Sequence, residues 1–567
     1  MAGGLLNIQA VGNANVILTG TPTKTFFKVV YSKYTNFGMQ KFRIDYDGLR
    51  EFRPSEPSTF SFKIPRYADL LMDTYLCITL PDIWSPIYHP CFPPDPTDPE
   101  ANADRVSTSG LWSPYEFKWI RNLGTNMIRE VAITCGALTI QKYSGEYLAA
   151  MVERDFSDEK KKLFNEMTGN TPEFYDIANS NRRINVYPSA YYNSVTTPAE
   201  PSFRSRKLYI PLNTWFGMDS RCAFPLIALQ YNELTITVTL RPTQELFQVR
   251  DVFDVANNFP YVQPDFNTDR FQIYRFLQPP PAVEINRENY TNFANNWNAD
   301  IHLLSTYCFL SEEERTQFAM EDQVYLVKDI FEYRFDNIVG TNKVKLTSSG
   351  MVSNWMWFFR RNDVNMRNEW SNYTNWLYST FVPSDIVPAP HTRIDGKGNG
   401  EGPAFQQGIT DMGINSGIYI TGEFNADNIR DIMVSMGIVL NGDYRENILP
   451  EGVFNYIEKY VRTEGYAQNG LYCYNFCLKT SPFEYQPSGA MNMSKFKTIE
   501  LEIATVVPAI NPLTSAVNII CDDNGNTIGV RKQTWRLYDY AYNMTLFEER
   551  YNILSFIGGN CGMLYAR

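Results

Sequence analysis

The chain has 567 residues, of which 44% are hydrophobic and 15% aromatic, and its formal net charge is −11. A chain of this length normally divides into two or more domains, and its apolar fraction suffices to fill their cores. The acidic balance argues against direct binding of nucleic acid through a general positive field.

The N-terminal stretch has no charged side chain before Lys24, and polar residues such as Asn7 and Gln9 interrupt its apolar runs. A secretory signal needs a basic start and an unbroken apolar block. We therefore expect residues 1–24 to form an extended arm that the mature protein keeps. No run in the chain approaches the roughly 18 apolar residues of a membrane-spanning helix, so we expect no transmembrane segment.

Strands are predicted through most of the first half. Short runs of β-branched and aromatic residues that end at Gly, Pro or Asn are typical of strands. Such runs occupy residues 23–46, 59–65, 74–80, 119–143, 207–215 and 226–240. The segment 119–143 is expected to contain a strand pair that turns at Cys135-Gly136.

A helix is predicted from Gly145 to Met167. Its apolar residues share one stripe, which continues across a break: Tyr147, Leu148, Met151, Val152, Phe156, Leu163 and Phe164. Lys160-Lys161-Lys162 is the only basic run in the chain and lies between acidic residues. This charge pattern indicates a solvated helix face.

The clearest strand alternates without a fault. Leu234, Ile236, Val238 and Leu240 fall on one face, and threonines occupy the positions between them. A period of two places the apolar side against a core. Ile499, Leu501 and Ile503 repeat this pattern near the end of the chain, and we expect each of the two strands to close one half of the protein.

Residues 243–298 are irregular and contain the triple proline 279–281, which indicates a linker or a surface insertion. In the second half we expect a helix at Ser311–Met320, where Ser311 and Glu314 fit a capping box. Asn441-Gly442 predicts a tight turn, and Asp523-Asn524-Gly525 predicts a last hairpin. Strands are expected at 300–310, 324–335, 343–347, 354–361, 417–421, 433–440, 471–478 and 496–505, and long loops at 87–105, 168–206 and 381–416.

Short strands bounded by turns, in two similar series, predict an all-β fold built as a duplicated jelly roll with long loop insertions and a few short helices. The expected division is an arm at 1–24, a first jelly roll at 25–245, a linker or insertion at 246–299, and a second jelly roll with the C-terminal tail at 300–567.

The cysteines and histidines give little indication of a disulfide framework or a metal site. The nine cysteines are scattered and odd in number, which favours buried free thiols made in a reducing compartment. Cys473 and Cys477 fall on one side of a strand, but a zinc site needs two more ligands, and the three histidines (His89, His302 and His391) lie on distant, unlike segments. We interpret the two cysteines as core thiols.

Other candidate motifs fail on spacing. The glycine run 395–402 lacks the phosphate-loop pattern and its strand–helix context, so we interpret it as a surface loop. The stretch 521–526 lacks the glycine and the closing glutamate of a calcium loop. Glu312–Glu314 fit the acidic first turn of a helix. The glycosylation sequons at Asn289, Asn372, Asn492 and Asn543 are interpreted as chance matches, because the chain has no secretory signal.

We therefore expect no enzymatic activity and no catalytic, cofactor-binding or metal-binding residue. A glycosidase needs only two carboxylates across a cleft, so a β-sandwich that binds or cleaves carbohydrate is the alternative hypothesis. A secreted adhesin with intact disulfides is a third.

Several stretches together resemble the major capsid proteins of nucleocytoplasmic large DNA viruses, of the mimivirus and phycodnavirus type. The N-terminal MAGGLLNIQAVG and the stretch 18–37 are similar to the start of that family, and PLIALQYNELTITV (225–238) resembles its central strand. Family-like blocks also occur, in the right order, at 139–153, 307–319 and 486–496. The loops at 87–105, 243–298 and 381–416 are longer than a compact member has.

This resemblance implies two eight-stranded antiparallel jelly rolls in tandem. It also implies homotrimeric capsomers of pseudo-hexagonal shape that tile the icosahedral shell of a large DNA virus. The implied partners are neighbouring capsomers and minor capsid proteins, the latter reached by the N-terminal arm and the capsomer base. The implied location is the virion, assembled in the cytoplasm of the host cell.

Overall fold

The computed structural model describes residues 13, 16–48, 51–88, 113–184, 187–188, 201–251, 260–281, 287–379, 429–508, 518–521, 527–531, 535–537 and 539–565. The expected loop at 381–416 and the expected strand at 417–421 lie outside these residues. So do the glycine run 395–402 and most of the loop at 87–105.

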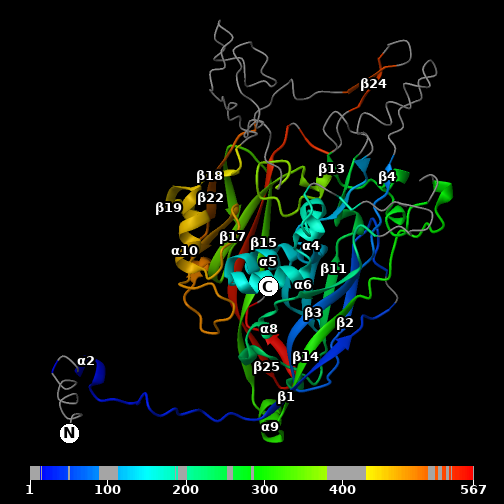
Figure 1. Ribbon diagram of the computed structural model, residues 1–567. Coiled ribbons are helices and arrows are strands. Elements are labelled where there is room, and N and C mark those ends of the chain that lie inside the picture. The colour runs from blue at the N-terminus through cyan, green and yellow to red at the C-terminus, as the bar shows by residue number, and fades with distance from the viewer. Residues whose placement is uncertain are drawn as a thin grey trace, which may run out of the picture.

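Two antiparallel sheets form the first jelly roll (Figure 1). One sheet has the order β1 (Phe37–Ile44), β14 (His302–Leu310), β3 (Leu70–Leu80) and β10 (Phe224–Pro225), and β9 (Arg206–Pro211) also pairs with β3. The facing sheet has the order β2 (Ser58–Lys63), β11 (Leu234–Leu240), β7 (Ile128–Cys135) and β8 (Leu138–Tyr143). Smaller pairings join β13 (Tyr261–Val262), β12 (Phe247–Arg250) and β6 (Phe117–Trp119), and β4 (Ile87–Tyr88) with β5 (Ser113–Pro114).

The second jelly roll repeats this arrangement. One sheet has the order β15 (Gln323–Ile338), β25 (Tyr542–Ile557), β17 (Met351–Arg361) and β20 (Leu471–Asn475), with β21 (Met491–Asn492) on β17 and β26 (Asn560–Met563) on β25. The other has the order β16 (Thr341–Leu346), β22 (Ile499–Thr505), β18 (Met433–Leu440) and β19 (Asp443–Pro450). The expected last hairpin is the pair β23 (Asn518–Cys521) and β24 (Thr527–Arg531).

Strand pairing confirms the duplicated jelly roll strand by strand. Each principal strand of the first roll has a counterpart in the second with the same neighbours. In one sheet the strands β1, β14, β3 and β9 correspond to β15, β25, β17 and β20. In the other, β2, β11, β7 and β8 correspond to β16, β22, β18 and β19. Each roll therefore has eight principal strands.

The same pairing corrects the expected division at residue 300. The strand β14 pairs with β1 and β3 along its whole length, so it is the last strand of the first roll and not the first strand of the second. Residues 243–298 are therefore an insertion between two strands of one roll. The strands β11 and β22 lie inside their sheets, and β14 and β25, not these two, are the last principal strands of the rolls.

The strand alternation and the tight turn predicted from neighbouring residues are confirmed in the structure. In β11 and β22 buried and half-buried residues alternate along the strand, as the period of two predicts. The half-buried threonines of β11 pair across the sheet, with 3.2 Å between the hydroxyl oxygens of Thr59 and Thr239. Asn441 and Gly442, at φ of 54° and 94°, form the predicted tight turn between β18 and β19.

The predicted helix at 145–167 is two helices, α5 (Gly145–Asp155) and α6 (Asp158–Thr168), and the break is at Phe156, whose backbone is extended. The helix α9 (Glu312–Met320) begins after Ser311 as expected, but the hydroxyl of Ser311 caps no backbone N–H, so the capping box is not formed. Shorter helices are α2 (Val16–Thr19), α4 (Leu123–Met127), α7 (Pro172–Tyr175), α8 (Trp215–Met218), α10 (Glu458–Arg462) and the π-helical turn η12 (Val453–Ile457). Single 3₁₀ turns are η2 (Ile177–Asn179), η3 (Ser220–Cys222), η4 (Leu226–Ala228), η5 (Thr243–Glu245), η7 (Asp269–Phe271), η8 (Ile273–Arg275), η9 (Arg287–Asn289), η10 (Val364–Arg367) and η13 (Met493–Lys495).

The two rolls share a core. Residues between the sheets of the first roll, such as Ile236, belong to one apolar cluster with Met356 and Phe547, which lie on the side of β17 and β25 that faces the first roll. The opposite side of these strands, with Trp355 and Trp357, fills the second roll. In Figure 1 the helix α5 crosses the front of the molecule between the two rolls.

Candidate functional site

The joint between the two rolls is built around α5. The hydroxyl of Ser144 accepts a hydrogen bond from the N–H of Tyr147 and caps the helix. Gly145 allows its first turn to approach α4, because a Cβ at this position would lie 1.8 Å from the carbonyl oxygen of Thr125. The ring of Tyr147 then packs edge-on against Phe547 of β25, 5.6 Å away.

The predicted apolar stripe of α5 is buried, but its charged residues Glu146, Arg154 and Asp155 are buried as well. Every residue of the helix except Glu153 is therefore buried, and the apolar stripe did not reveal its buried charges.

A buried ion network joins the rolls at Arg154. Its guanidinium lies 2.6 Å from a carboxylate oxygen of Asp155 and 2.8 Å from one of Glu549, and all three side chains are at most 1% exposed. It also donates a hydrogen bond of 2.7 Å to the side-chain oxygen of Asn354. The ammonium of Lys328 lies 3.4 Å from the second oxygen of Glu549. Charges from α5, β15 and β25 thus meet in one place, beside the neutral amide of Asn354 on β17.

The charges of this network hold one another ionised. Burial opposes ionisation of Glu549, but the charges of Arg154 and Lys328 outweigh it and lower the pKa of Glu549 to about 2. Burial likewise disfavours the charged form of Arg154, yet the neighbouring Asp155 and Glu549 raise the pKa of Arg154 well above its ordinary value. A carboxylate with so low a pKa stays ionised near neutral pH, far from the pKa near the working pH that suits a general acid or base.

A second cluster repeats this chemistry. The carboxylate of Glu146 lies 2.9 Å from the guanidinium of Arg241 in the first roll and 3.0 Å from that of Arg360 in the second. Burial opposes ionisation of Glu146, but the charges of Arg360 and Arg241 lower its pKa overall.

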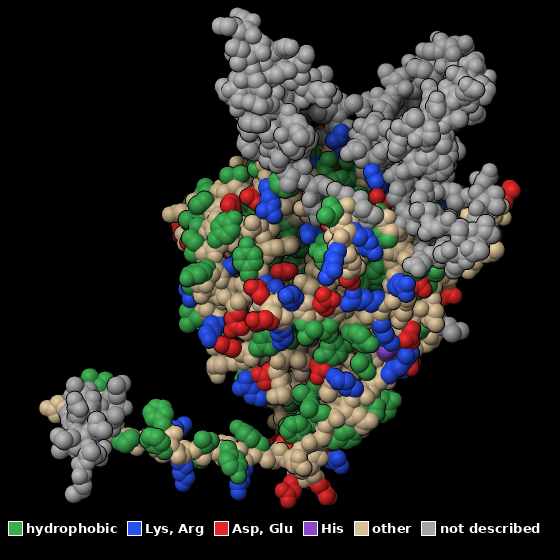
Figure 2. All heavy atoms as spheres, viewed as in Figure 1, with side chains coloured by type: hydrophobic (Ala, Val, Ile, Leu, Met, Phe, Trp, Pro, Cys, Tyr) green, Lys and Arg blue, Asp and Glu red, His purple; other side chains and the backbone are tan. Residues whose placement is uncertain are grey.

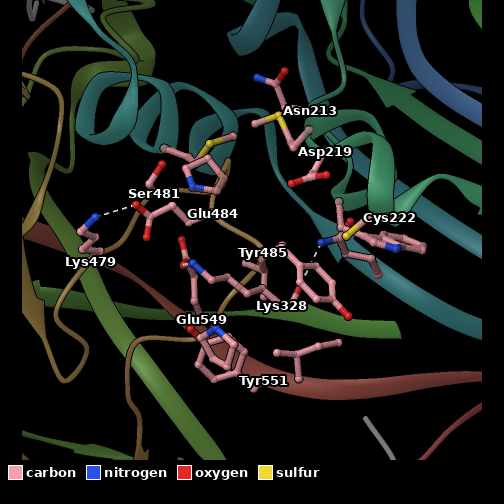
Figure 3. Close-up of a pocket in the computed structure, with 18 of the residues that line it drawn as sticks. Asn213, Asp219, Cys222, Lys328, Lys479, Ser481, Glu484, Tyr485, Glu549 and Tyr551 are labelled. Carbon is pink, nitrogen blue, oxygen red and sulfur yellow. Dashed lines mark hydrogen bonds and ion pairs between the residues drawn. The ribbon is translucent and has the colours of Figure 1, made fainter. Parts of the chain in front are cut away.

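A small cavity lies beside this joint (Figure 3). Its volume is about 90 Å³, and Asp219 and Cys222 of the first roll face Lys328, Glu549 and Tyr551 of the second across it. Sites for small ligands usually enclose several hundred Å³. The carboxylates around it are paired, as with Glu484 and Lys479 at 2.7 Å. We therefore interpret the cavity as a packing gap in a structural joint and not as a substrate site.

The candidate metal ligands do not come together. Cys473 and Cys477 are buried thiols, as expected, and burial raises the pKa of each. The imidazole of His302 lies 2.7 Å from the backbone oxygen of Asp300, in the other roll. Within the part of the chain that the structure describes, no three Cys, His, Asp or Glu residues are placed to hold a metal ion. The turn residues 522–526 lie outside that part.

The structure also tests the predictions for the acidic turn at 312–314, the sequon at Asn372 and the basic run at 160–162. Glu312–Glu314 form the acidic first turn of α9, as predicted. Asn372 is 1% exposed and donates its amide to the carbonyl of Trp376, so its sequon lies in the folded interior. The solvated face predicted at Lys160–Lys162 is wrong for Lys161, which is 8% exposed and donates to the carbonyl of Tyr466 in the second roll.

Two apolar surfaces are exposed. The first, which we call the α10 flank, consists of Ile448, Tyr456, Ile457, Tyr460, Val461 and Tyr466, which are 50–91% exposed. Figure 2 shows hydrophobic side chains along this left-hand side, where Figure 1 places α10 and β19. The second is the arm. It extends past its expected end at residue 24 to residue 36, so the strand expected from residue 23 begins only at Phe37. Phe26 and Phe27 in the arm are 103% and 99% exposed. The arm extends away from both rolls at the lower left of Figure 1. No helix among the described residues is long and apolar enough to cross a membrane.

Two family models match successive parts of the chain. Residues 25–277 match "Major capsid protein N-terminus", and residues 314–562 match "Large eukaryotic DNA virus major capsid protein". The chain belongs to the major capsid proteins of large eukaryotic DNA viruses.

Relatives extend over the whole chain. The major capsid proteins of Phaeocystis pouchetii virus and Paramecium bursaria Chlorella virus 1 are 24% and 23% identical, and each alignment covers all of both proteins. Capsid protein 1 of Acanthamoeba polyphaga mimivirus is 28% identical over 68% of this chain and 51% of its own length.

Solved structures share the fold. A capsid protein in the PBCV-1 virus capsid matches with a TM-score of 0.55 and 19% identity over 96% of this chain and all of that one. The Faustovirus major capsid protein matches with a TM-score of 0.54 and 11% identity over 98% of this chain and 98% of that one. The major capsid protein described here is thus a structural component of the virion and not an enzyme, and the comparisons give no support to the carbohydrate-binding alternative.

Proposed function

We propose that three copies of this major capsid protein form a pseudo-hexagonal capsomer, and that such capsomers tile the icosahedral shell. In this proposal no residue has a catalytic, cofactor-binding or metal-binding role. Each copy contributes two similar jelly rolls, so a closed ring of three copies presents six similar lobes, which suits a hexagonal lattice. The shell would assemble in the host cytoplasm.

The observation that carries the proposal is the repeat of one contact surface. Within one chain α5, which lies between β8 and β9, covers the outer side of β17, β20 and β25. The helix α10 lies at the same place of the second roll, between β19 and β20, yet Tyr460 and Val461 on it are 91% and 57% exposed. The α10 flank thus has the same place in the second roll as α5 has in the first, but no further roll of the described chain covers it.

The matching acceptor surface is the outer side of β9, β3 and β14 in the first roll. In β9 Tyr209 pairs with Cys77 of β3, as Cys473 of β20 pairs with Met356 of β17. Cys473 is fully buried by the joint between the rolls, whereas Tyr209 is 41% exposed. We infer that the α10 flank of one copy covers this side of the next copy, and that three such contacts close the trimer.

The oligomeric state of the full chain tests the proposal. We expect sedimentation velocity at micromolar concentration to give a trimer, because a permanent interface of this kind buries on the order of 2,000 Å² with an apolar centre. The double variant Ile457→Asp with Tyr460→Asp should sediment as a folded monomer, because it places two charges in that centre. The control Leu163→Asp, at a residue 61% exposed on α6, should stay trimeric.

A monomeric parent chain would contradict the trimer. A parent trimer that survives the double variant would contradict the α10 flank as its contact.

The arm has a different role in the proposal. Its apolar residues alternate with Lys24, Lys28 and Lys33, and its aromatic side chains lie in solvent beyond the base of β1. We propose that it binds neighbouring copies or minor capsid proteins on the inner side of the shell, where such side chains leave water.

A further inference from the structure

Two cysteines that are far apart in the sequence, Cys135 and Cys561, lie next to each other. Cys135 ends β7 in the first roll and is 1% exposed, and Cys561 lies on β26 and is partly exposed. The strand β26 is the second strand of a C-terminal hairpin that turns at Gly558-Gly559 and pairs with β25 of the second roll.

Backbone contacts seat this hairpin on the first roll. The N–H of Gln230 donates to the carbonyl oxygen of Gly559 at 3.0 Å, and the side-chain amide of Asn232 donates to that of Asn560 at 3.4 Å. The approach is close, because a Cβ on Gly559 would lie 2.9 Å from Cβ of Gln230. The hairpin therefore has a defined position and is not a loose tail.

The same contacts bring the thiols together. Leu234, two residues after Asn232, lies opposite Cys135 in the sheet, and Cys561 directly follows Asn560. Cys561 packs against the apolar cluster that contains Cys135, and the two thiols share a hydrogen bond. This bond lowers the pKa of Cys135 and raises that of Cys561. Arg66, whose guanidinium donates to the carbonyl of Asn232 at 2.8 Å, also lowers the pKa of Cys135.

The other described cysteines with a shifted pKa behave differently. Burial is the largest cause for Cys77, Cys222, Cys308, Cys473 and Cys477, and it raises the pKa of each thiol. A thiolate is the species that attacks a disulfide, so Cys135 is the cysteine of this group best suited to close a bond once a partner sulfur is activated.

We propose that Cys135 and Cys561 form a reversible disulfide that ties the C-terminal hairpin of the second jelly roll to the first. Both thiols stay reduced in a reducing compartment, and the bond closes in surroundings that supply a small-molecule disulfide such as oxidised glutathione.

The exchange has two steps. The thiolate form of Cys135 takes the proton of the partly exposed Cys561 as Cys561 attacks one sulfur of the small disulfide. This gives a mixed disulfide and releases one small thiolate, which takes up the proton that Cys135 had lost to solvent. The thiolate of Cys135 then attacks the sulfur of Cys561 and releases the second small thiol, which takes the proton of Cys135. The protein loses two electrons and two protons, and one small disulfide becomes two thiols.

Peptide mapping of the full chain tests this directly. After incubation with oxidised glutathione and blocking of free thiols, we expect one cross-linked peptide pair that contains Cys135 and Cys561, and it should vanish on treatment with dithiothreitol. The oxidised chain should melt about 3 °C higher than the reduced chain, because the bond closes a very long loop. Dithiothreitol should reverse this shift.

Cysteine variants distinguish loss of the disulfide from a general change in the stability of the fold. Cys561→Ser, at a partly exposed position, should melt like the reduced parent and show no shift on oxidation. The control Cys477→Ser should keep the cross-link and the shift. The proposal is overturned if both thiols stay open to alkylation after oxidation, if Cys561 stops at the mixed disulfide, or if another cysteine takes its place.

Discussion

Arg154 lies between the carboxylates of Asp155 and Glu549, and all three side chains are out of contact with water. Moving such charges out of water costs several kcal/mol per ion, and only close pairing offsets that cost. Arg154 meets this condition, because its guanidinium contacts both carboxylates and the amide oxygen of Asn354. The contact between the rolls is thus held by specific ion pairs as well as by apolar packing.

Loss of this guanidinium should loosen the joint. We expect Arg154→Met to lower the free energy of unfolding by about 3–5 kcal/mol, because it leaves a buried carboxylate without its cation. Calorimetry of the purified chain measures the effect. The control Arg53→Met removes an exposed pair with Glu56 and should cost less than about 1 kcal/mol. Equal losses for the two variants would contradict a buried role for Arg154.

Acid should weaken the same joint. The pKa of Glu549 is about 2 in the folded chain against 4.5 for the free side chain. A lowered folded pKa gives stability that is present above the unfolded value and is lost as the pH falls from 4.5 toward 2. We expect Glu549→Gln to be less stable than the parent by about 3 kcal/mol at neutral pH.

The difference between Glu549→Gln and the parent should narrow as the pH falls below 4.5, when the parent carboxylate is protonated on unfolding. Melting temperatures of both proteins across this range provide the measurement. A difference that does not change with pH would mean that Glu549 is not ionised in the folded chain.

At the scale of elements, α5 is held by a close backbone approach. A Cβ on Gly145 would lie 1.8 Å from the carbonyl oxygen of Thr125 and 2.5 Å from that of Ile128, which are backbone atoms that side-chain rotation cannot move. The position of the helix therefore depends on the absence of a side chain at its first residue.

A methyl group at this position should displace the helix. We expect Gly145→Ala to lower the free energy of unfolding by about 3 kcal/mol or more, although alanine is the better helix former, because α5 carries the interface contacts. Gly38→Ala is the matched control, since a Cβ there meets nothing within 4 Å. Thermal unfolding of the two variants decides the point. A neutral Gly145→Ala would show that α4 and α5 can separate without cost.

At the scale of the whole molecule, two rolls with the same strand order differ in what covers them. The second roll is covered by α5 of the first, whereas the α10 flank and the arm meet no part of the described chain that would cover their apolar side chains. These exposed apolar side chains are the basis of the proposed contacts between copies.

The arm should act on assembly alone. We expect the double variant Phe26→Ser with Phe27→Ser to melt within about 1 °C of the parent, since both rings lie in solvent. Its association into larger particles, followed by light scattering, should be weaker by about tenfold or more, because two aromatic side chains lose their burial. The control Lys28→Gln tests charge at the same place. If it has the same effect, the contact is electrostatic.

Most of the fold and little of the joint could be predicted from the sequence. The alternation in β11, the turn at Asn441-Gly442 and the helical character of residues 145–167 depend on neighbours in the chain, so their residues determined them. Glu549 and Lys328 were not singled out from the sequence, because a charged position within a strand is too common a signal to identify a joint.

The tertiary structure decided which distant segments meet. The residue types predict a strand at 300–310, but only the pairing of β14 with β1 and β3 places it in the first roll. The burial of Lys161, the contact of Arg154 with Glu549, and the meeting of Cys135 with Cys561 also join residues far apart in the chain. Local pattern is set by which side chains avoid water, whereas the choice of partner is set by how the whole chain closes on itself.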